Sequence, residues 1–166
     1  MDKNLTSMDI RDPGLRSLPP GVERYLVKGG ELSVISLDPD DKVEITDTEG
    51  KQKCEIIVFN KDGKPDCSLL GLKEKNDSKN IKKILSDKKN ESAFQAASAL
   101  KKRNLDVGKA KASILFSDDS EAGEKINLVS RDKCTCVFSA PGNTMKINEQ
   151  NPPTDLLLMV KRSKPN

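Results

Sequence analysis

The sequence contains no histidine and no tryptophan, and it has a single tyrosine and four phenylalanines. The absence of histidine removes the commonest general base and the commonest transition-metal ligand in proteins. Ser-His-Asp and Cys-His nucleophilic sites are therefore excluded, as are the zinc sites that need imidazole. The low aromatic content predicts a core of leucine, isoleucine and valine, with the phenylalanines as its largest members.

No apolar run approaches the ~20 residues that a membrane-spanning helix needs. The opening sequence MDKNLTSMDIRDPG also lacks the apolar segment of a signal peptide. We therefore expect a cytoplasmic protein with no membrane partner. In that compartment its four cysteines are expected to be reduced thiols: Cys54, Cys67, Cys134 and Cys136.

Two blocks of the sequence alternate apolar, β-branched runs with short turn sequences, which is typical of antiparallel strands. The first block predicts a meander of strands at about 24–28, 31–37, 42–48 and 53–60. Within it, Val43 and Ile45 alternate with Glu44 and Thr46, the pattern of a half-buried strand. The second block predicts strands at about 111–117, 125–130, 133–139 and 155–162.

The segment between the two blocks is basic and has helical spacing. Residues 73–111 carry 12 Lys/Arg and 5 Asp/Glu, whereas the rest of the chain carries 17 and 21. Ser78 is expected to cap a first short helix, and Ser92-x-x-Gln95 fits a capping box at the start of a second. The buried face of the second helix is predicted to hold Ala93, Phe94, Ala97 and Leu100.

These patterns predict a mainly β (α+β) fold: an antiparallel β-sandwich or partly open barrel with an inserted basic helical hairpin. At 166 residues the chain has the length of one domain. The expected division is an irregular leader at 1–20, a single β domain at 21–162 with its helical insertion at about 73–109, and a tail or the start of a linker at 163–166.

The sequence predicts no catalytic set and no metal site. Cys134 and Cys136 stand two residues apart, so they share one face of a strand. Two thiolates in this arrangement can hold a soft cation or take part in thiol chemistry, but cysteine is also a small buried hydrophobe. We favour the core interpretation. The carboxylates fall in predicted turns, where solvation and turn geometry explain them.

The basic hairpin offers a surface for an anionic partner, at Lys82, Lys83, Lys88 and Lys89. Clustered lysines attract polyanions. Binding of single-stranded nucleic acid normally adds stacking aromatic side chains, and this segment has one phenylalanine, predicted on the apolar face. We therefore favour a solvated helix pair, expect no nucleic-acid partner, and leave the oligomeric state open.

Two groups of residues resemble the urea carboxylase-associated family and cover about half of the chain. The first consists of Leu18-Pro-Pro-Gly21, Lys28-Gly-Gly30 and the run from Val43 to Gln52. The second consists of Ala112 to Asp118, Ile126 to Val129, and Asp132-Lys-Cys134. The resemblance implies a β-rich fold whose members hold a metal with cysteine and histidine. Since histidine is absent and Cys134 alone matches, this chain looks like a copy that keeps the scaffold without the metal centre.

Other motifs resemble the amino-terminal modules that precede aminomethyltransferases of the glycine cleavage T-protein type. They are Arg24-Tyr-Leu26, Asp47 to Gln52, and Asn151 to Leu156. This resemblance implies a non-catalytic accessory domain, with a scaffold or ligand-gating role, in one-carbon metabolism. A transferase domain in the same chain or complex is the implied partner. Tetrahydrofolate would bind in that partner domain, and no cofactor is expected in this chain.

The accessory domain is our leading functional hypothesis, and two alternatives stay open. One is a small-ligand-binding or hydrolytic enzyme of the urea carboxylase-associated type. The resemblance places its ligand site near Asp47, Gln52 and Cys134, brought together across strands. The other is an anion-binding interaction module that acts through the lysine-rich hairpin.

Overall fold

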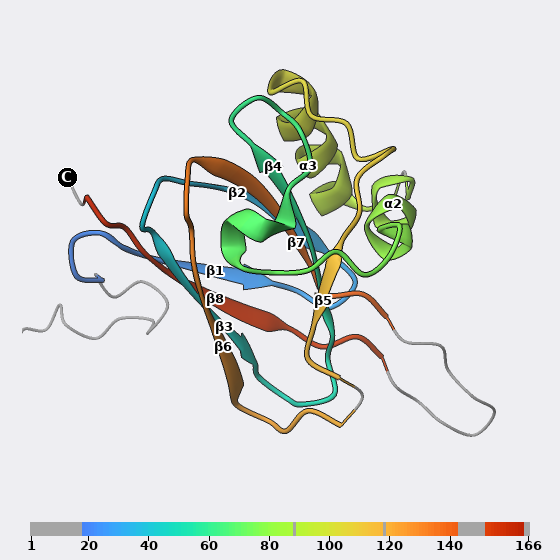
Figure 1. The fold of residues 1–166 in the computed structure, drawn as a ribbon. Helices are drawn as coiled ribbons and strands as arrows, with labels where there is room; N and C mark the ends of the chain where they lie inside the picture. The colour runs from blue at the N-terminus through green and yellow to red at the C-terminus, as the bar shows by residue number, and fades with distance from the viewer. Residues whose placement is uncertain (1–17, 88, 118, 143–151, 165–166) are drawn as a thin grey trace, which may run out of the picture.

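The computed structural model describes residues 18–87, 89–117, 119–142 and 152–164, and shows two four-stranded antiparallel sheets packed face to face (Figure 1). The strands are β1 (Val22–Val27), β2 (Leu32–Leu37), β3 (Lys42–Asp47), β4 (Cys54–Asn60), β5 (Ser113–Leu115), β6 (Glu124–Val129), β7 (Cys134–Ser139) and β8 (Leu156–Lys161). The insertion between β4 and β5 holds a short 3-10 helix, η3 (Cys67–Leu70), and the helices α2 (Lys79–Leu85) and α3 (Glu91–Lys102). The predicted fold class, a β-sandwich with an inserted helical pair, is confirmed.

The order of the strands differs from the predicted meander, which is wrong. One sheet has the order β1-β8-β3-β6 and the other β2-β7-β4-β5, so the chain passes from one sheet to the other at nearly every step. Two such four-stranded sheets with interleaved strands form a jelly roll. Turn residues locate the strand ends, but they do not reveal whether the next strand joins the same sheet or the facing one.

The strand patterns follow from what covers each sheet. In β3, Val43 and Ile45 point into the sandwich and lie opposite Val160 and Leu158 of β8. The other face of that sheet carries more exposed residues, so β3 alternates as predicted as far as Ile45, whereas Thr46 on the predicted polar face is buried. In contrast, β4 is buried along almost its whole length because its sheet is covered on both faces.

The covering of that second sheet divides the apolar interior into two clusters. The larger cluster lies between the sheets and includes Ile35, Ile45, Ile56, Phe138 and Leu158. The smaller one joins the outer face of the second sheet to the insertion, through Leu32, Ile57, Phe59, Val137, Ile81, Ala96 and Leu100. The helical pair is therefore packed onto the sheet as a third layer (Figure 1).

Helix α3 begins two residues earlier than the predicted capping box. Asn90 is the N-cap, and its side chain accepts a hydrogen bond from the Ala93 amide. The Ser92 hydroxyl instead donates to the carbonyl of Leu32 on the edge strand β2. The predicted capping role of Ser92 is therefore wrong, because a tertiary contact competes for its hydroxyl.

The predicted buried face of α3 is correct for two residues and wrong for two. Ala93 and Leu100 are buried, whereas Ala97 is exposed and Phe94 is 75% exposed. Alanines recur along this helix, so its sequence is compatible with more than one apolar stripe, and the stripe that includes Ala96 is the one that packs.

Helix α2 also starts without the predicted cap. Ser78 precedes it with a φ of 56°, and its side chain makes no capping hydrogen bond. The hydroxyl donates instead to the carbonyls of Asp77 and Ala110. The helix begins all the same, because the buried carboxylate of Glu55 accepts the Ile81 amide and the Asn80 side-chain amide.

In the residues that the structure covers, no helix is long and apolar enough to cross a bilayer. The cytoplasmic location stays a prediction. All four cysteines are buried free thiols. The predicted leader lies outside the described residues except for 18–20, and the predicted tail is described only at 163 and 164.

Candidate functional site: a charged pocket beside a dithiol

A polar cavity of about 650 Å³ lies where the edge strands β1 and β2, from different sheets, approach each other. We call it the Arg162 pocket. Its walls come from β1, β2, the turn after β2, the residue before β7 and the residues after β8. The lining residues are Gly21, Glu23, Ser36, Asp38, Asp41, Lys133, Arg162 and Lys164. Its volume falls in the range of small-molecule sites.

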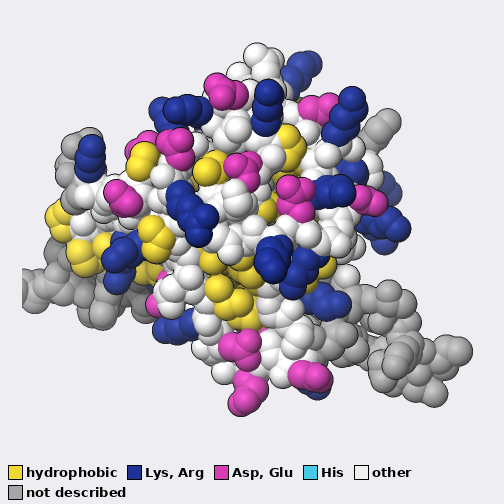
Figure 2. Space-filling view, viewed as in Figure 1, with side chains coloured by type: hydrophobic (Ala, Val, Ile, Leu, Met, Phe, Trp, Pro, Cys, Tyr) yellow, Lys and Arg dark blue, Asp and Glu magenta, His cyan; other side chains and the backbone are white. Residues whose placement is uncertain are grey.

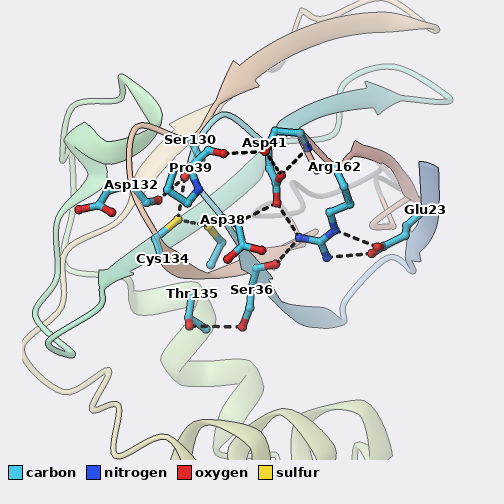
Figure 3. A network of polar contacts seen from close by, with 12 residues as sticks. Glu23, Ser36, Asp38, Pro39, Asp41, Ser130, Asp132, Cys134, Thr135 and Arg162 are labelled. Atoms are coloured by element: carbon cyan, nitrogen blue, oxygen red, sulfur yellow. Dashed lines mark hydrogen bonds and ion pairs between the residues drawn. The ribbon is translucent and has the colours of Figure 1, made fainter. Parts of the chain in front are cut away.

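Arg162 stands at the centre of this pocket and binds both sheets (Figure 3). Its Nε and Nη2 donate to the two carboxylate oxygens of Glu23, each at 2.8 Å. Its Nη1 donates to Oδ2 of Asp41 and to the Ser36 carbonyl, both at 2.8 Å. The paired, two-pronged contact with Glu23 is the geometry that makes arginine–carboxylate pairs strong. The guanidinium thus joins β1 to β2 across the open side of the sandwich.

Asp41 is the buried member of the cluster, with a side chain that is 1% exposed. Besides Arg162 it accepts hydrogen bonds from the amides of Asp38 and Ser163, both at 2.8 Å. Burial raises the pKa of Asp41, but these hydrogen bonds outweigh it and hold the pKa below its ordinary value. The pKa of Glu23 is also lowered, chiefly by its hydrogen bonds to Arg162. Both groups are therefore carboxylates at neutral pH.

The remaining charged groups of the pocket are more accessible. Asp38, Lys133 and Lys164 are exposed. The Asp38 carboxylate accepts no hydrogen bond from the part of the chain that the structure describes. Three carboxylates around one guanidinium leave the floor of the pocket negative, while the two lysines place positive charge on its wall. The pocket can therefore meet a small molecule that carries both signs of charge.

A pair of thiols adjoins the pocket. The Ser130 amide donates to the Asp41 carbonyl at 2.9 Å, and the Ser130 hydroxyl lies 3.3 Å from the sulfur of Cys134 (Figure 3). The sulfur of Cys134 lies 3.7 Å from that of Cys136. Both cysteines belong to the core between the sheets, as predicted from their spacing. The core therefore reaches the wall of the pocket at this point.

The two thiols differ in acidity. The hydrogen bond with Cys136 lowers the pKa of Cys134, and Ser130 acts in the same direction against burial. The same hydrogen bond and complete burial raise the pKa of Cys136 well above its ordinary value. Cys134 is therefore the more acidic of the two thiols, and Cys136 is the one that keeps its proton more strongly. Within the described residues, no set of three or more His, Cys, Asp or Glu side chains is placed to hold a metal ion.

A second cavity, of about 550 Å³, has Cys134 among its lining residues, and we call it the Cys134 pocket. Lys61, Arg103 and Lys133 contribute cationic side chains to its lining. Ser36 and Lys133 also line the Arg162 pocket. The two cavities are therefore neighbours that share part of one wall.

The predicted ligand residues Asp47 and Gln52 lie together, but in a turn whose polar groups bind one another. Asp47 is fully buried, and its carboxylate accepts from the Gly50 and Gln52 amides and the Ser120 hydroxyl. The Gln52 side chain donates to the carbonyls of Lys53 and Pro141 and accepts from Thr154. These contacts hold the turn and the start of β8 in place.

Cys134 does not join that turn, so the structure does not bring the predicted residues Asp47, Gln52 and Cys134 together. Asp47 ends β3, whereas the Ser130–Cys134 contact lies beside Asp41, just before β3 begins. A strand of this length separates the two by roughly 20 Å at ~3.4 Å per residue. Strand direction, which the sequence does not give, decides which strand ends meet.

The four lysines of the predicted anion-binding surface are not uniformly exposed. Lys82 is half-buried, Lys83 and Lys89 are exposed, and Lys88 lies outside the described residues. Lys83 lines a cavity of about 450 Å³ with Asn80 and Asn90. Basic and acidic side chains are interspersed on the face that Figure 2 shows. Anion binding through these lysines stays a prediction.

No sequence pattern predicted the residues of the Arg162 pocket. Arg162 is 139 residues from Glu23 and 121 from Asp41 along the chain. No local spacing links such distant residues. The one available signal was an arginine placed directly after a strongly apolar strand.

Comparison with known proteins shows that the sequence is similar to part of an enzyme. No family model matches the sequence. The chain is 29% identical over 154 residues, or 93% of its length, to trimethylamine-oxide aldolase from Ruegeria pomeroyi DSS-3. It spans only 19% of the length of that relative.

The chain also resembles a crystal structure of a DUF1989 family protein from Silicibacter pomeroyi DSS-3, with a TM-score of 0.51. The match covers 95% of this chain and 90% of that one at 9% identity. At this identity the likeness shows the fold alone, which fits a β domain of the DUF1989 type.

The leading functional prediction is corrected by these findings. A non-catalytic accessory domain of an aminomethyltransferase-like protein conflicts with a relative that is named as an aldolase and matches nearly the whole chain. The prediction rested in part on the absence of a recognisable catalytic motif. Spatially assembled groups such as those around Arg162 leave no such motif.

Proposed function

We propose that this chain forms part of an enzyme that releases an aldehyde from small methylated amine oxides, with the Arg162 pocket as the substrate site. The single observation that carries the proposal is the sequence similarity to trimethylamine-oxide aldolase over 93% of the chain. In this proposal the elements between residues 21 and 162 work as one domain. The proposal also includes membership of the urea carboxylase-associated family, which the motif from Val43 to Gln52 supports.

The charges of the pocket support this choice of substrate. An amine oxide carries a positive nitrogen shielded by methyl groups and a negative oxygen one bond away. Asp38 and the Glu23–Asp41 pair supply negative charge for the methylated nitrogen, and Lys133 and Lys164 supply positive charge for the oxygen. Because the Arg162 guanidinium is occupied by its own carboxylates, it serves to fix these groups in position.

The expected products follow from the atoms of the substrate. Loss of formaldehyde from trimethylamine oxide leaves dimethylamine, and the two products account for every atom. Neither an oxidant nor a reductant is consumed. Assays of both products therefore measure the proposed reaction directly.

Binding of trimethylamine oxide to the purified chain, followed by amide NMR shifts, tests the substrate site. We expect a saturable shift at Ser36, Asp38 and Lys133, with a dissociation constant of about 1 mM, near 4 kcal/mol of binding energy. Tert-butanol has the same shape without the charges and is the matched control ligand. It is expected to bind at least about tenfold more weakly, a difference of roughly 1.4 kcal/mol.

Two substitutions separate this site from nonspecific binding. Asp38→Asn removes an exposed carboxylate of the pocket and is expected to weaken binding by about tenfold. Glu44→Gln removes a carboxylate on β3 that pairs with Lys125 outside the pocket, and is the control that leaves binding unchanged. Equal affinity for trimethylamine oxide and tert-butanol, or an unaffected Asp38→Asn variant, would overturn the assignment of the pocket.

A further inference from the structure

The sulfurs of Cys134 and Cys136 lie close together on one face of β7. They lie 3.7 Å apart, in van der Waals contact, because residues two apart on a strand project in the same direction. Each of the other two cysteines has its own surroundings. Cys67 donates to backbone carbonyls, and Cys54 is fully enclosed in the core. The chain therefore has one dithiol and two separate thiols.

The pair lies next to a cavity that Cys134 helps to line. Cys134 belongs to the lining of the Cys134 pocket, although only 2% of the residue is exposed. Lys133 and Ser36 belong to both this pocket and the Arg162 pocket. A product released from the Arg162 pocket therefore has the Cys134 pocket as its neighbour.

The contacts of the pair favour a nucleophile at Cys134. The thiolate is the reactive form of cysteine. Cys136 is placed to donate a hydrogen bond to the Cys134 sulfur at 3.7 Å, whereas the Ser130 hydroxyl, 3.3 Å from that sulfur, donates its proton to the Asp132 carbonyl. The thiol of Cys136 thus stabilises negative charge on Cys134 and holds a proton next to it. The pair thus combines a nucleophile and a proton donor.

We propose that Cys134 and Cys136 are a covalent capture site for formaldehyde, which they bind as a methylene bridge between the two sulfurs. The Cys134 thiolate adds to the carbonyl carbon, and the thiol of Cys136 gives its proton to the carbonyl oxygen, which yields a hydroxymethyl thioether. The Cys136 sulfur then displaces the hydroxyl group, which takes up one proton from solvent and leaves as water. Two thiols and one formaldehyde become one bridge and one water, with no oxidant or reductant.

The geometry suits a one-carbon bridge better than a direct bond between the sulfurs. A disulfide requires the sulfurs to approach to about 2.05 Å, whereas the pair lies 3.7 Å apart on one strand. A carbon atom inserted between them needs a much smaller displacement. The proposal rests on the proposed function only for the source of the aldehyde.

The test uses formaldehyde itself at one equivalent per protein. After quenching and removal of the excess, the protein is digested with trypsin and analysed by mass spectrometry. The peptide of residues 134–146 contains both cysteines and no internal lysine. We expect this peptide to gain the mass of one carbon atom and to lose both alkylatable thiols, while the peptides with Cys54 and Cys67 and the lysines stay unmodified.

Single substitutions supply the matched controls. Cys134→Ser and Cys136→Ser are each expected to abolish the bridge completely, and Cys67→Ser is expected to retain it. Circular dichroism of each variant checks that it folds. If a variant does not fold, protection of the wild-type protein by phenylarsine oxide, which binds paired thiols, gives an independent measurement of the same site.

Three results would overturn the capture site: free thiols in peptide 134–146, modification confined to lysines, or oxidation to a disulfide alone. Because formaldehyde is added directly, each of these leaves the proposed function standing. Conversely, a lack of trimethylamine oxide binding sinks the proposed function and leaves the dithiol chemistry intact. Carbon-13 from labelled trimethylamine oxide that appears in peptide 134–146 of the full-length enzyme would join the two.

Discussion

Replacement of Arg162 by methionine tests whether the guanidinium is what fastens the open side of the sandwich. Methionine keeps most of the side-chain volume and removes the charge and all donors. Asp41, with a side chain that is 1% exposed, would lose its ionic partner. Removal of one partner from a buried pair costs about 3–5 kcal/mol. Asp41 keeps the amides of Asp38 and Ser163, so we assign about 2–3 kcal/mol to this contact.

The other contacts of Arg162 add less. The Glu23 side chain is 37% exposed, so water takes over part of its interaction, and we assign about 0–1 kcal/mol to that pair. The Ser36 carbonyl loses one hydrogen bond, worth about 1 kcal/mol or less once solvent reaches it. The expected loss of unfolding free energy is about 3 kcal/mol, which lowers the melting temperature by roughly 6–12 °C for a chain of this size.

Urea unfolding at pH 7 measures this loss as a lower midpoint at an unchanged slope. Arg162→Lys keeps the charge without the two-pronged geometry, and is expected to fall between wild type and Arg162→Met. Arg24→Met removes an exposed arginine from β1 and is expected to change stability by less than about 0.5 kcal/mol. The reasoning fails if Arg162→Met is within about 1 kcal/mol of wild type, or if Arg24→Met is equally destabilising.

Other predictions concern the same contacts and two separate parts of the fold. The pKa values of Glu23 and Asp41 are lower in the folded protein than in the unfolded chain, where they are about 4. The two carboxylates therefore stabilise the fold above that pH, and this contribution is lost as the pH falls through their pKa values in the folded protein. Urea midpoints measured at pH 7, 4 and 3 should accordingly fall less steeply in Arg162→Met than in wild type. Asp47→Ala removes the acceptor of three hydrogen bonds and should cost about 2–4 kcal/mol by urea unfolding, whereas a residue kept only for a ligand would leave stability unchanged. By the same measurement, Phe94→Ser should change stability by less than about 0.5 kcal/mol because Phe94 is 75% exposed.

Strand positions were predictable from the sequence because their signals are local. The alternation of Val43 and Ile45 with polar neighbours, and the turn residues on either side, place β3 without knowledge of its partners. The partners themselves were not predictable. β3 pairs with β6 and β8, more than 70 residues away, and any strand with an apolar face satisfies the same pattern. The predicted meander failed for this reason.

The helix ends show the opposite error, in which a local motif was present and tertiary contacts overrode it. Ser92 and Gln95 have the spacing of a capping box, but the Ser92 hydroxyl binds the edge of β2, and Asn90 caps the helix instead. Similarly, Ser78 turns its hydroxyl to the Ala110 carbonyl, and the buried Glu55 receives the amide at the start of α2. Propensity and capping motifs are weak where a competing partner is packed nearby.

The candidate site was predictable only where its residues are neighbours in sequence. Cys134 and Cys136 could be paired from their spacing, and their burial in the core was expected. A core position is nevertheless compatible with a position at the wall of a cavity. β7 runs from the wall of the Cys134 pocket into the interior, so its first residue is both a core residue and part of that wall. A strand that enters a core at a pocket gives its terminal side chain both roles.

The Arg162 cluster and the cysteine pair are linked through Asp41 and Ser130. The Arg162 cluster holds β1 to β2 and places Asp38 and Asp41 at the turn after β2, while the Asp41 carbonyl receives the amide of Ser130. Ser130 in turn contacts the Cys134 sulfur. A displacement of Asp41 therefore reaches the dithiol through a single residue. The carboxylates that would hold a charged amine oxide and the thiolate that would hold its aldehyde are fixed by one continuous set of hydrogen bonds. Loss of the Arg162 contacts should consequently disturb both sites together, whereas loss of either cysteine should leave the charged pocket unchanged.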